Sequence, residues 1–168
     1  MTKKVLDLIQ YIRVILQTEQ KIILMCETKQ AIPVARKLPE TRSAKNHKFN
    51  IAGYEGYITV GLYEDGTPGE LFITMDEQGS TVGGLLDTIG SMTSIALQYG
   101  VPLEVMVRRF AFRRFEPSGF TRNPEIRSAT SIVDYVFRWM GREFIPGLSE
   151  ESLRGEGELV LPTVISGK

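Results

Sequence analysis

Cysteine and histidine are almost absent from this chain. Its 168 residues include one cysteine and one histidine, and 20 basic residues balance 20 acidic ones, for a formal net charge of zero. A single cysteine, Cys26, can form no disulfide within the chain; this fits a reducing compartment, so we expect a cytoplasmic protein. A neutral chain has no overall field to attract nucleic acid or an acidic membrane, so electrostatic recognition must be local. Cys26 and His47 are too few ligands for a zinc centre, and we expect no metal site.

Long apolar runs are also missing. No stretch approaches the roughly 18 apolar residues of a membrane span, so we expect no membrane partner. Near the N-terminus, Asp7, Gln10 and Arg13 interrupt the apolar positions. This pattern is not that of a signal peptide.

The chain has no recognisable catalytic motif. Cys26 lies in an apolar run, where a buried and unreactive thiol is expected. Residues 79–84 are rich in glycine and can open a helix whose N–H groups attract an anion, but they lack the Lys-Ser/Thr pair of a P-loop. An ordinary capped helix start is the simpler interpretation. We therefore expect no catalytic residue, and a small enzyme that uses His47, Glu116 or Asp134 is the least favoured alternative.

The apolar pattern divides the chain into four parts. Residues 1–28 form an N-terminal helical segment, residues 29–46 a basic linker, residues 47–146 an α+β domain, and residues 147–168 a tail that we expect to be mobile. The first segment is predicted as an amphipathic helix because its apolar residues recur at helical spacing: Val5, Leu8, Ile9, Ile12, Ile15 and Leu16.

Alternating apolar residues predict a three-stranded antiparallel meander at the start of the α+β domain. The inward positions are Phe49 and Ile51 in the first strand, Ile58, Val60 and Leu62 in the second, and Leu71, Ile73 and Met75 in the third. On the second strand, Tyr57, Thr59 and Tyr63 should share the opposite face. One apolar face of such a sheet must be covered, so we expect a two-layer α+β fold with about three helices.

Three helical stripes follow the sheet and are expected to cover it. The first begins after Ser80 or Thr81, the second at Pro102, and the third at Ser128 or Thr130, with a stop at Gly141. Their inward residues are predicted as Leu85, Leu86, Ile89, Met92 and Ala96; Leu103, Met106, Val107 and Phe110; and Ile132, Val133, Val136, Phe137 and Met140. Gly83, Gly84 and Gly90 weaken the first helix, which suggests close backbone packing or a helix start near a ligand.

A polar, turn-forming loop at residues 116–123 lies next to a cluster of arginines. Residues 108–122 carry five basic side chains and one acid, a local net charge of +4. Arginine suits bidentate contacts with phosphate or carboxylate, but a solvated face, or pairing with Glu116 and Glu125, explains the cluster equally well. Interleaved aromatic residues (Phe112, Phe115 and Phe120) would also suit a protein interface.

Seven strings in this chain carry a resemblance to a known family. They are Leu-Pro-Glu-Thr-Arg at 38–42, His-Lys-Phe at 47–49, Gly-Tyr-Glu-Gly-Tyr-Ile-Thr-Val-Gly at 53–61, Tyr-Glu-Asp-Gly-Thr-Pro-Gly-Glu at 63–70, Ala-Leu-Gln-Tyr-Gly-Val-Pro-Leu-Glu at 96–104, Arg-Phe-Glu-Pro-Ser-Gly-Phe-Thr at 114–121 and Ser-Ile-Val-Asp-Tyr-Val-Phe-Arg-Trp at 131–139. In this order they resemble the region after the catalytic barrel in adenosylcobalamin-dependent (class II) ribonucleotide reductases.

The resemblance implies a non-catalytic role. A reductase of that family needs a large barrel with a thiyl-radical cysteine, a redox cysteine pair and a cysteine-bearing tail, whereas this chain has one cysteine. The expected function is an accessory domain or subunit that docks on a catalytic reductase chain and supports assembly or nucleotide handling in deoxyribonucleotide synthesis. Adenosylcobalamin belongs to the catalytic part of the family, and we expect none bound by this chain alone.

The alternative of a different class is a nucleotide- or nucleic-acid-binding module that uses the basic patch at residues 108–122. The candidate binding residues are Arg109, Arg113, Arg114, Glu116, Ser118, Gly119, Thr121, Arg122 and His47. We expect the short polar residues of the loop to fix the geometry between two packed helices, and the arginines and phenylalanines to face a partner or a phosphate. A homo-oligomer stays open.

Overall fold

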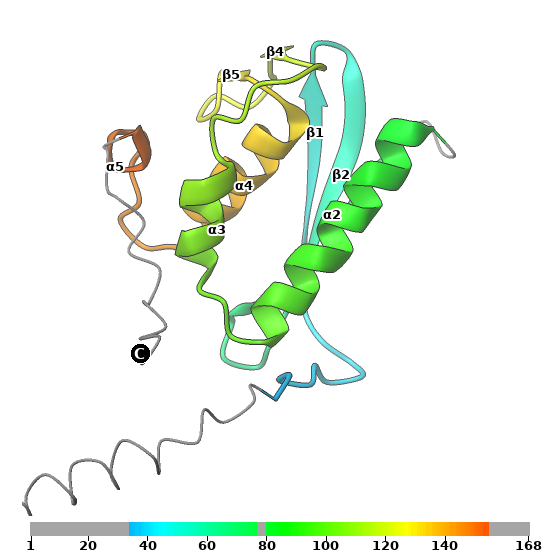
Figure 1. Cartoon of the computed structure of the whole chain (residues 1–168), viewed down its shortest axis with the longest axis vertical. Coiled ribbons are helices and arrows are strands. Elements are labelled where there is room, and N and C mark those ends of the chain that lie inside the picture. The colour runs from blue at the N-terminus through cyan, green and yellow to red at the C-terminus, as the bar shows by residue number, and fades with distance from the viewer. Residues whose placement is uncertain (1–33, 77–79, 155–168) are drawn as a thin grey trace, which may run out of the picture. The chain divides into compact units, whose positions relative to one another are not determined.

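The computed structural model describes residues 34–76 and 80–154 (Figure 1). The elements are β1 (Ala44–Ile51), β2 (Tyr54–Leu62), β3 (Pro68–Met75), α2 (Thr81–Gln98), α3 (Leu103–Phe110), β4 (Gly119–Phe120), β5 (Ser128–Ala129), α4 (Ile132–Phe144) and α5 (Glu150–Arg154). The predicted N-terminal helix and most of the predicted tail lie outside the described residues. Among those residues, no helix has the length and apolar character needed to cross a membrane.

The antiparallel meander is confirmed, and with it the α+β fold. The strand order is β1-β2-β3, and β1 pairs with β2 from Ala44 opposite Gly61 to Ile51 opposite Tyr54. Ala52 and Gly53 join these strands with φ values of 50° and 93°, as a two-residue hairpin turn requires. β1 begins at Ala44, so the last three residues of the segment predicted as a linker belong to the strand.

The predicted alternation fails at the end of β2. The register shifts between Gly61 and Leu62, so Leu62 is only half-buried and Tyr63, expected on the outer face, is buried. The Tyr63 hydroxyl donates to the carbonyl oxygen of Arg36 at 2.7 Å, and the Arg36 guanidinium lies 3.7 Å above the Tyr63 ring. Because of this register shift, side chains no longer alternate between the two faces at the end of β2. The segment that contains Arg36 covers the Tyr63 ring.

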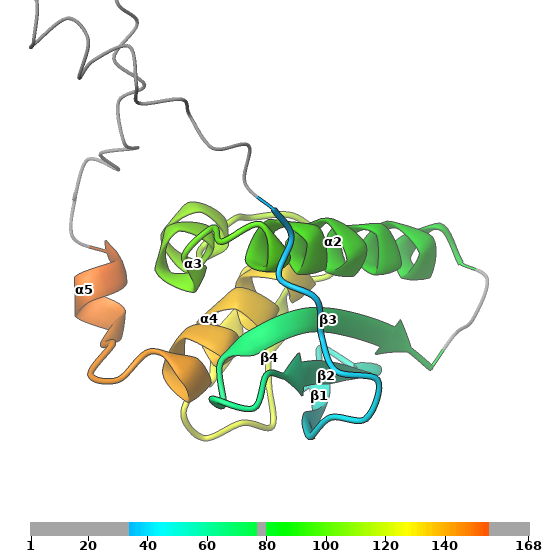
Figure 2. The same cartoon turned by 90° about the horizontal axis from the view of Figure 1, so that it is seen from below.

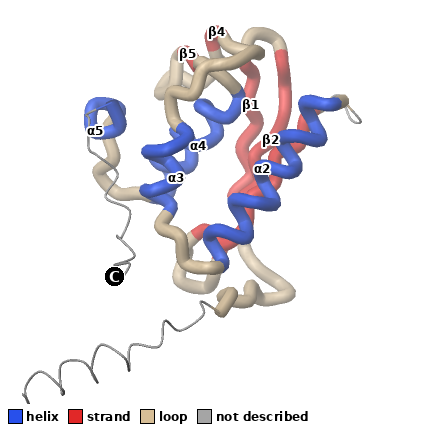
Figure 3. Tube along the Cα trace, in the orientation of Figure 1, coloured by secondary structure: helices blue, strands red, loops and turns tan. Residues whose placement is uncertain are grey.

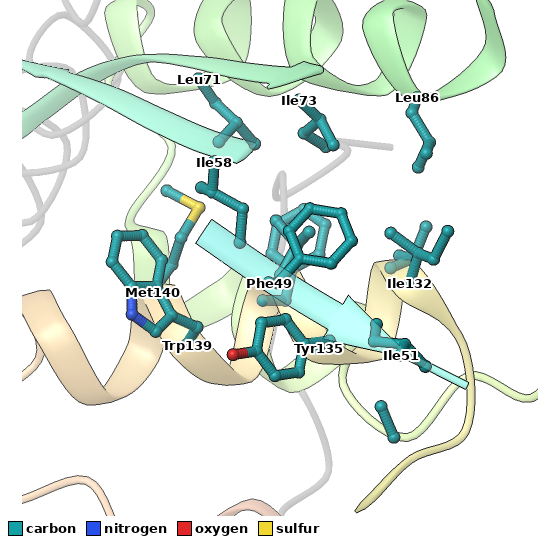
Figure 4. Close-up of a cluster of buried hydrophobic side chains, with 14 of the residues drawn as sticks. Phe49, Ile51, Ile58, Leu71, Ile73, Leu86, Ile132, Tyr135, Trp139 and Met140 are labelled. Atoms are coloured by element: carbon teal, nitrogen blue, oxygen red, sulfur yellow. The ribbon is translucent and has the colours of Figure 1, made fainter. Parts of the chain in front are cut away.

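One face of the sheet carries the core. Side chains from β1, β2 and β3 meet α4 there, and Leu86 of α2 closes one end (Figure 4). Phe49 and Tyr135 pack with ring centroids 5.7 Å apart. The described chain has four helices in place of about three, because the short α5 follows α4 (Figure 3).

Helix α2 lies along the free edge of β3 (Figure 2), although the sequence predicted that it would cover the apolar face. The Ser94 hydroxyl receives a hydrogen bond from the Leu71 N–H at 2.8 Å, and a Cβ at Gly90 would stand 2.7 Å from the Leu71 carbonyl oxygen. Close backbone packing is therefore confirmed. The helix thus satisfies an edge strand that would otherwise expose its N–H and C=O groups.

This position rotates α2 away from its predicted orientation. Leu86, Gly90 and Thr93 are buried, whereas Leu85 and Met92, both expected to point inward, are 60% and 65% exposed. The approach at Gly90 decides the rotation, because only the face with a missing side chain can come this close to β3.

Helix α2 starts where the sequence predicted, whereas both ends of α4 differ from the prediction. Ser80 caps α2 by accepting from the Gly83 N–H at 3.0 Å. The cap of α4 is Ser131, neither Ser128 nor Thr130, and it accepts from the Asp134 N–H at 3.0 Å. Helix α4 also continues past Gly141 to Phe144, since a Cβ at Gly141 would meet Leu148 and Val107 and glycine is used there for packing.

Candidate functional site

The segment between α3 and α4 carries most of the predicted site residues and is fastened to the β1–β2 turn. Gly119 pairs with Ala129, and the Ala52 N–H donates to the Phe120 carbonyl at 3.1 Å. Gly119 has a φ of 151°, and a Cβ there would lie 2.9 Å from the Ala52 Cβ. Glycine is needed at this contact for both its conformation and its size.

The polar residues of this segment shape its turns. The Glu116 carboxylate accepts from the Ser118 N–H and hydroxyl, both at 2.9 Å. The Thr121 hydroxyl accepts from the Asn123 N–H at 3.1 Å and donates to the Ile126 carbonyl. These bonds agree with the expectation that the loop residues fix the path between two helices. They do not point to a ligand.

The arginine cluster is divided by the fold. Arg108 is held by Glu104 at 2.8 Å and by the Ser152 carbonyl at 3.0 Å. Arg113 donates to the Arg109 carbonyl at 3.1 Å. Within the described residues, the guanidinium groups of Arg109 and Arg114 make no ion pair or hydrogen bond, and both side chains are exposed.

The alternative in which these arginines pair with Glu116 and Glu125 is not seen among the described residues. Glu116 bonds to Ser118, as above, and Glu125 pairs with Arg142 at 3.5 Å. Arg122 lies apart from the cluster and approaches Glu55 at 3.6 Å. The positive surface that is open to an anion is therefore Arg109, Arg113 and Arg114, a smaller patch than the sequence predicted.

The sequence suggested that Phe112 would face a partner, but its ring packs against two arginines of this chain. Phe112 has a φ of 60°, and its ring lies under two guanidinium groups, Arg138 at 5.1 Å and Arg154 at 4.5 Å. Phe115 and Phe120 are exposed. Phe112 faces inward because its own N–H is tied to Asp134 at 2.7 Å.

Asp134 is fully buried and belongs to a structural network. It accepts hydrogen bonds from Phe112 N–H and from Thr130 N–H at 2.8 Å, and lies 3.4 Å from Arg138. Arg138 also donates to the Ser128 carbonyl at 2.9 Å and pairs with Glu150. His47, Glu116 and Asp134, the residues of the small-enzyme alternative, are thus held by three separate sets of partners.

His47 and Arg122 are brought together at the edge of β1, in a cavity of about 390 Å³. The His47 Nε2 lies 2.8 Å from the Tyr135 hydroxyl, which accepts from Asn123 Nδ2 at 3.1 Å. The imidazole stacks on Trp139 with centroids 4.8 Å apart and an interplanar angle of 16°. Within the described part of the chain, no group of three or more His, Cys, Asp and Glu residues could hold a metal ion.

The charges at the rim of this cavity are balanced by Glu55. Lys48 pairs with Glu55 at 2.7 Å, and Asn50 donates to it at 2.9 Å. The hydrogen bond from Lys48, then that from Asn50, holds the pKa of the Glu55 carboxyl below its ordinary value. Sequence reasoning missed Tyr135 and Asn123 here. The alternation of His47 with Phe49 and Ile51 was the available signal, since it places His47 on the core face.

The stability of the protein should fall as the pH drops below about 6.5, the ordinary pKa of histidine. Burial lowers the pKa of His47 in the folded state, and Glu143 opposes this only in part. The unfolded chain therefore binds a proton at a pH where the folded protein resists it, and protonation favours unfolding. Urea unfolding between pH 7 and pH 5 should show a shallower decline in the free energy of unfolding for His47→Phe, which keeps an aromatic ring to stack on Trp139 but cannot titrate. An equal decline in both proteins would contradict this assignment.

Comparison with known proteins identifies a family and several relatives. The TSCPD domain family matches residues 29–144. A protein of Rhodopirellula baltica called vitamin B12-dependent ribonucleotide reductase is 57% identical over 115 residues, which are 68% of this chain and 11% of that protein. A protein of the same name from Streptantibioticus cattleyicolor is 46% identical over 114 residues, 68% of this chain and 19% of the relative. The chain thus spans about a tenth to a fifth of these relatives, and no solved structure matches it.

Proposed function

Because this chain belongs to the TSCPD domain family, we propose that it is a non-catalytic accessory module of a vitamin B12-dependent ribonucleotide reductase. One observation carries the proposal: 57% identity to such a reductase is confined to 11% of its length. A region that forms so small a share of a large enzyme works together with the remainder. The proposed partner is the catalytic part of the reductase, in deoxyribonucleotide synthesis.

The described residues do not fit the cofactor of these relatives. The cavities beside the β1–β2 turn and beside His47 measure about 580 and 390 Å³, which suits a drug-sized ligand. Adenosylcobalamin is several times larger. We therefore assign the cofactor to the catalytic part, and this chain's contribution to docking and support.

The open face of the sheet is the surface we propose for docking. No described helix covers this face, and its cross-strand rows include Thr59 opposite Phe72 and Tyr57 opposite Thr74. Phe72 and Tyr57 are 46% and 39% exposed, and Lys48 lies beside Tyr57. Exposed tyrosine and phenylalanine side chains of this kind are enriched in protein interfaces.

Capture of a catalytic reductase chain that lacks this region tests the proposal. The tagged full chain should retain it, and Phe72→Glu should weaken retention by about tenfold or more, as the loss of an aromatic interface anchor does. Leu85→Glu, an equal change on the outer face of α2, should leave retention unchanged. Thermal melts of both variants exclude misfolding. Absence of retention by the unmodified chain would refute the accessory role.

A second candidate is a nucleotide- or nucleic-acid-binding module. It is favoured by Arg109 and Arg114, which have no ion pair within the described residues, together with Arg113. Binding of a nucleotide or oligonucleotide that weakens steeply with salt, and that Arg109→Gln with Arg113→Gln abolishes, would support it. Absence of binding at low salt would dismiss it.

A further inference from the structure

Strand β1 lies at the edge of the sheet, and one of its two sides has a row of unpaired backbone groups. The order β1-β2-β3 leaves β1 with one neighbouring strand. The Leu62 N–H donates to the Ser43 carbonyl oxygen at 2.9 Å, so Ala44 and Gly61, which follow, form a pair that exchanges no hydrogen bond. By the same alternation, Ala44, Asn46 and Lys48 direct their N–H and C=O groups away from β2.

The far end of the same side of β1 is already occupied by this chain. The Ala52 N–H donates to the Phe120 carbonyl oxygen at 3.1 Å, and Ile51 forms an isolated antiparallel bridge with Thr121. This side of the hairpin therefore accepts an antiparallel segment. Because the bridge is isolated, that segment does not continue along β1 toward Ala44. A free row of donors and acceptors at a sheet edge is a template for another strand.

The cavity beside His47 lies against this edge. Its lining includes four consecutive residues of β1, at positions 47–50. Neighbouring side chains of a strand point to opposite faces, so a cavity lined by four in a row borders the edge of β1. Tyr135 and Trp139 of α4 and Asn123 line it as well. With about 390 Å³ and aromatic walls, it has room for one large apolar side chain of an added strand.

The rim of this cavity carries an excess of positive charge. Lys48 and Arg122 share one carboxylate, that of Glu55, at 2.7 and 3.6 Å. The Arg122 side chain is 80% exposed. Glu125, which also lines the cavity, is paired with Arg142. Two cations that share one carboxylate favour a partner that brings a second carboxylate to the rim.

Charge also argues against a second copy of this chain at the edge. Strand β1 contains Lys45 and Lys48 and no acidic residue. Two β1 strands side by side would bring these lysines close together, and like charges on neighbouring strands are destabilising. An extended segment with an acidic residue meets no such repulsion.

We propose that the free side of β1 binds an extended, acidic peptide segment of a partner protein, which joins the sheet as a further strand. The backbone of this segment bonds to Ala44, Asn46 and Lys48. One large apolar side chain of the segment enters the cavity beside His47. The next residue points to the opposite face of the sheet, where its carboxylate lies beside Lys48 and Arg122. The inference does not depend on the proposed function, since a peptide tests it on this chain alone.

Amide exchange in the full chain tests the proposal. The N–H groups of Asn46 and Lys48 should exchange fast in the free protein, whereas those of Lys45 and His47, which face β2, should be protected. The probe is the acetylated and amidated peptide Thr-Phe-Glu-Val-Thr-Thr. At about ten times its dissociation constant, it should slow exchange at Asn46 and Lys48 about tenfold. The single tryptophan, Trp139, lines the cavity, so its fluorescence reports the binding.

Two substitutions at position 46 separate the backbone from the side chain. Asn46→Pro removes an N–H that does not bond to β2, a change that edge strands tolerate. It should weaken binding of the probe about tenfold or more, because an acceptor on the probe loses its donor. Asn46→Ala is the matched control and should bind like the wild type. Thermal melts of both variants exclude misfolding.

Changes in the probe test the same contacts without altering the fold. N-methylation at alternate residues should abolish binding for one of the two sets of positions only, because one side of the peptide meets β1. Arg122→Gln should weaken binding about two- to fivefold, as an exposed ion pair does. It should have no such effect on a probe with glutamine in place of glutamate.

Three results would overturn the proposal. They are no binding of the probe, binding that leaves exchange at Asn46 and Lys48 unchanged, and a dimer in sedimentation that Asn46→Pro dissociates, since the dimer would place a second copy at the edge. Phe72→Glu, on the open face of the sheet, should leave binding of the probe unchanged. The edge and the proposed reductase contact can therefore fail separately.

Discussion

Replacing Asp134 by alanine should lower the free energy of unfolding by about 3–5 kcal/mol, as removal of one partner of a buried ion pair does. Asp134 is 0% exposed. Its carboxylate serves two backbone N–H groups, of Phe112 and Thr130, and faces Arg138 at 3.4 Å. The alanine variant would bury both donors without an acceptor and leave Arg138 with Glu150 as its remaining carboxylate partner.

Urea unfolding of three variants measures this effect. Asp134→Asn retains one acceptor oxygen but turns an amide toward the donors, so it should fall between the wild type and Asp134→Ala. Asp87→Ala, an exposed change on α2, should alter the free energy by less than about 0.5 kcal/mol. A loss of less than about 1 kcal/mol in Asp134→Ala would mean that water replaces the carboxylate, and that the network is not a determinant of stability.

The same substitution at two glycines of α2 should have opposite effects. Gly90→Ala places a Cβ 2.7 Å from the Leu71 carbonyl oxygen, a backbone atom that cannot turn aside. The helix must shift from the edge of β3, which strains the Ser94 bond to the Leu71 N–H. Such overpacking lowers the free energy of unfolding by about 1–3 kcal/mol. Gly84→Ala meets nothing within 4 Å and should stabilise by about 0.5–1 kcal/mol through the unfolded chain.

Thermal and urea unfolding of the two variants check this pair. Because helix propensity favours alanine at both positions, the difference between them isolates the contact with β3. Amide exchange at Leu71 should speed up in Gly90→Ala and stay unchanged in Gly84→Ala. If Gly90→Ala were as stable as Gly84→Ala, the close approach of α2 to the sheet edge would be wrong.

The spacing of apolar residues correctly predicted the strands that have one buried face and one exposed face. Ile58 and Val60 alternate with outward residues because one face of β2 is buried and the other is open. The helix start at Ser80 was equally readable, since a serine hydroxyl can satisfy the first N–H groups. Resemblance to the reductases was carried by the same segments, from the strands to α4.

What the sequence could not predict depends on contacts between distant segments. Tyr63 is buried by Arg36, 27 residues away, and no local pattern shows this. The face that α2 turns toward β3 is set by the missing Cβ at Gly90. The spacing of apolar residues does not reveal this contact. The same limit applied to the site. In the sequence, Arg108, Arg109 and Arg122 contribute equal charges to the basic cluster, but in the fold Arg108 pairs with Glu104 and Arg122 with Glu55.

The contacts of the buried Arg138 guanidinium extend beyond the C-terminal end of the family match. The match ends at residue 144, whereas Arg138 is paired with Glu150 of α5, and Arg154 of α5 covers the ring of Phe112. A fragment cut at residue 144 would keep the matched residues that the structure describes but would lose Glu150, one of the two carboxylates that pair with Arg138. A fragment designed to keep the Arg138 guanidinium paired should therefore extend through α5, to Arg154, beyond the last matched residue.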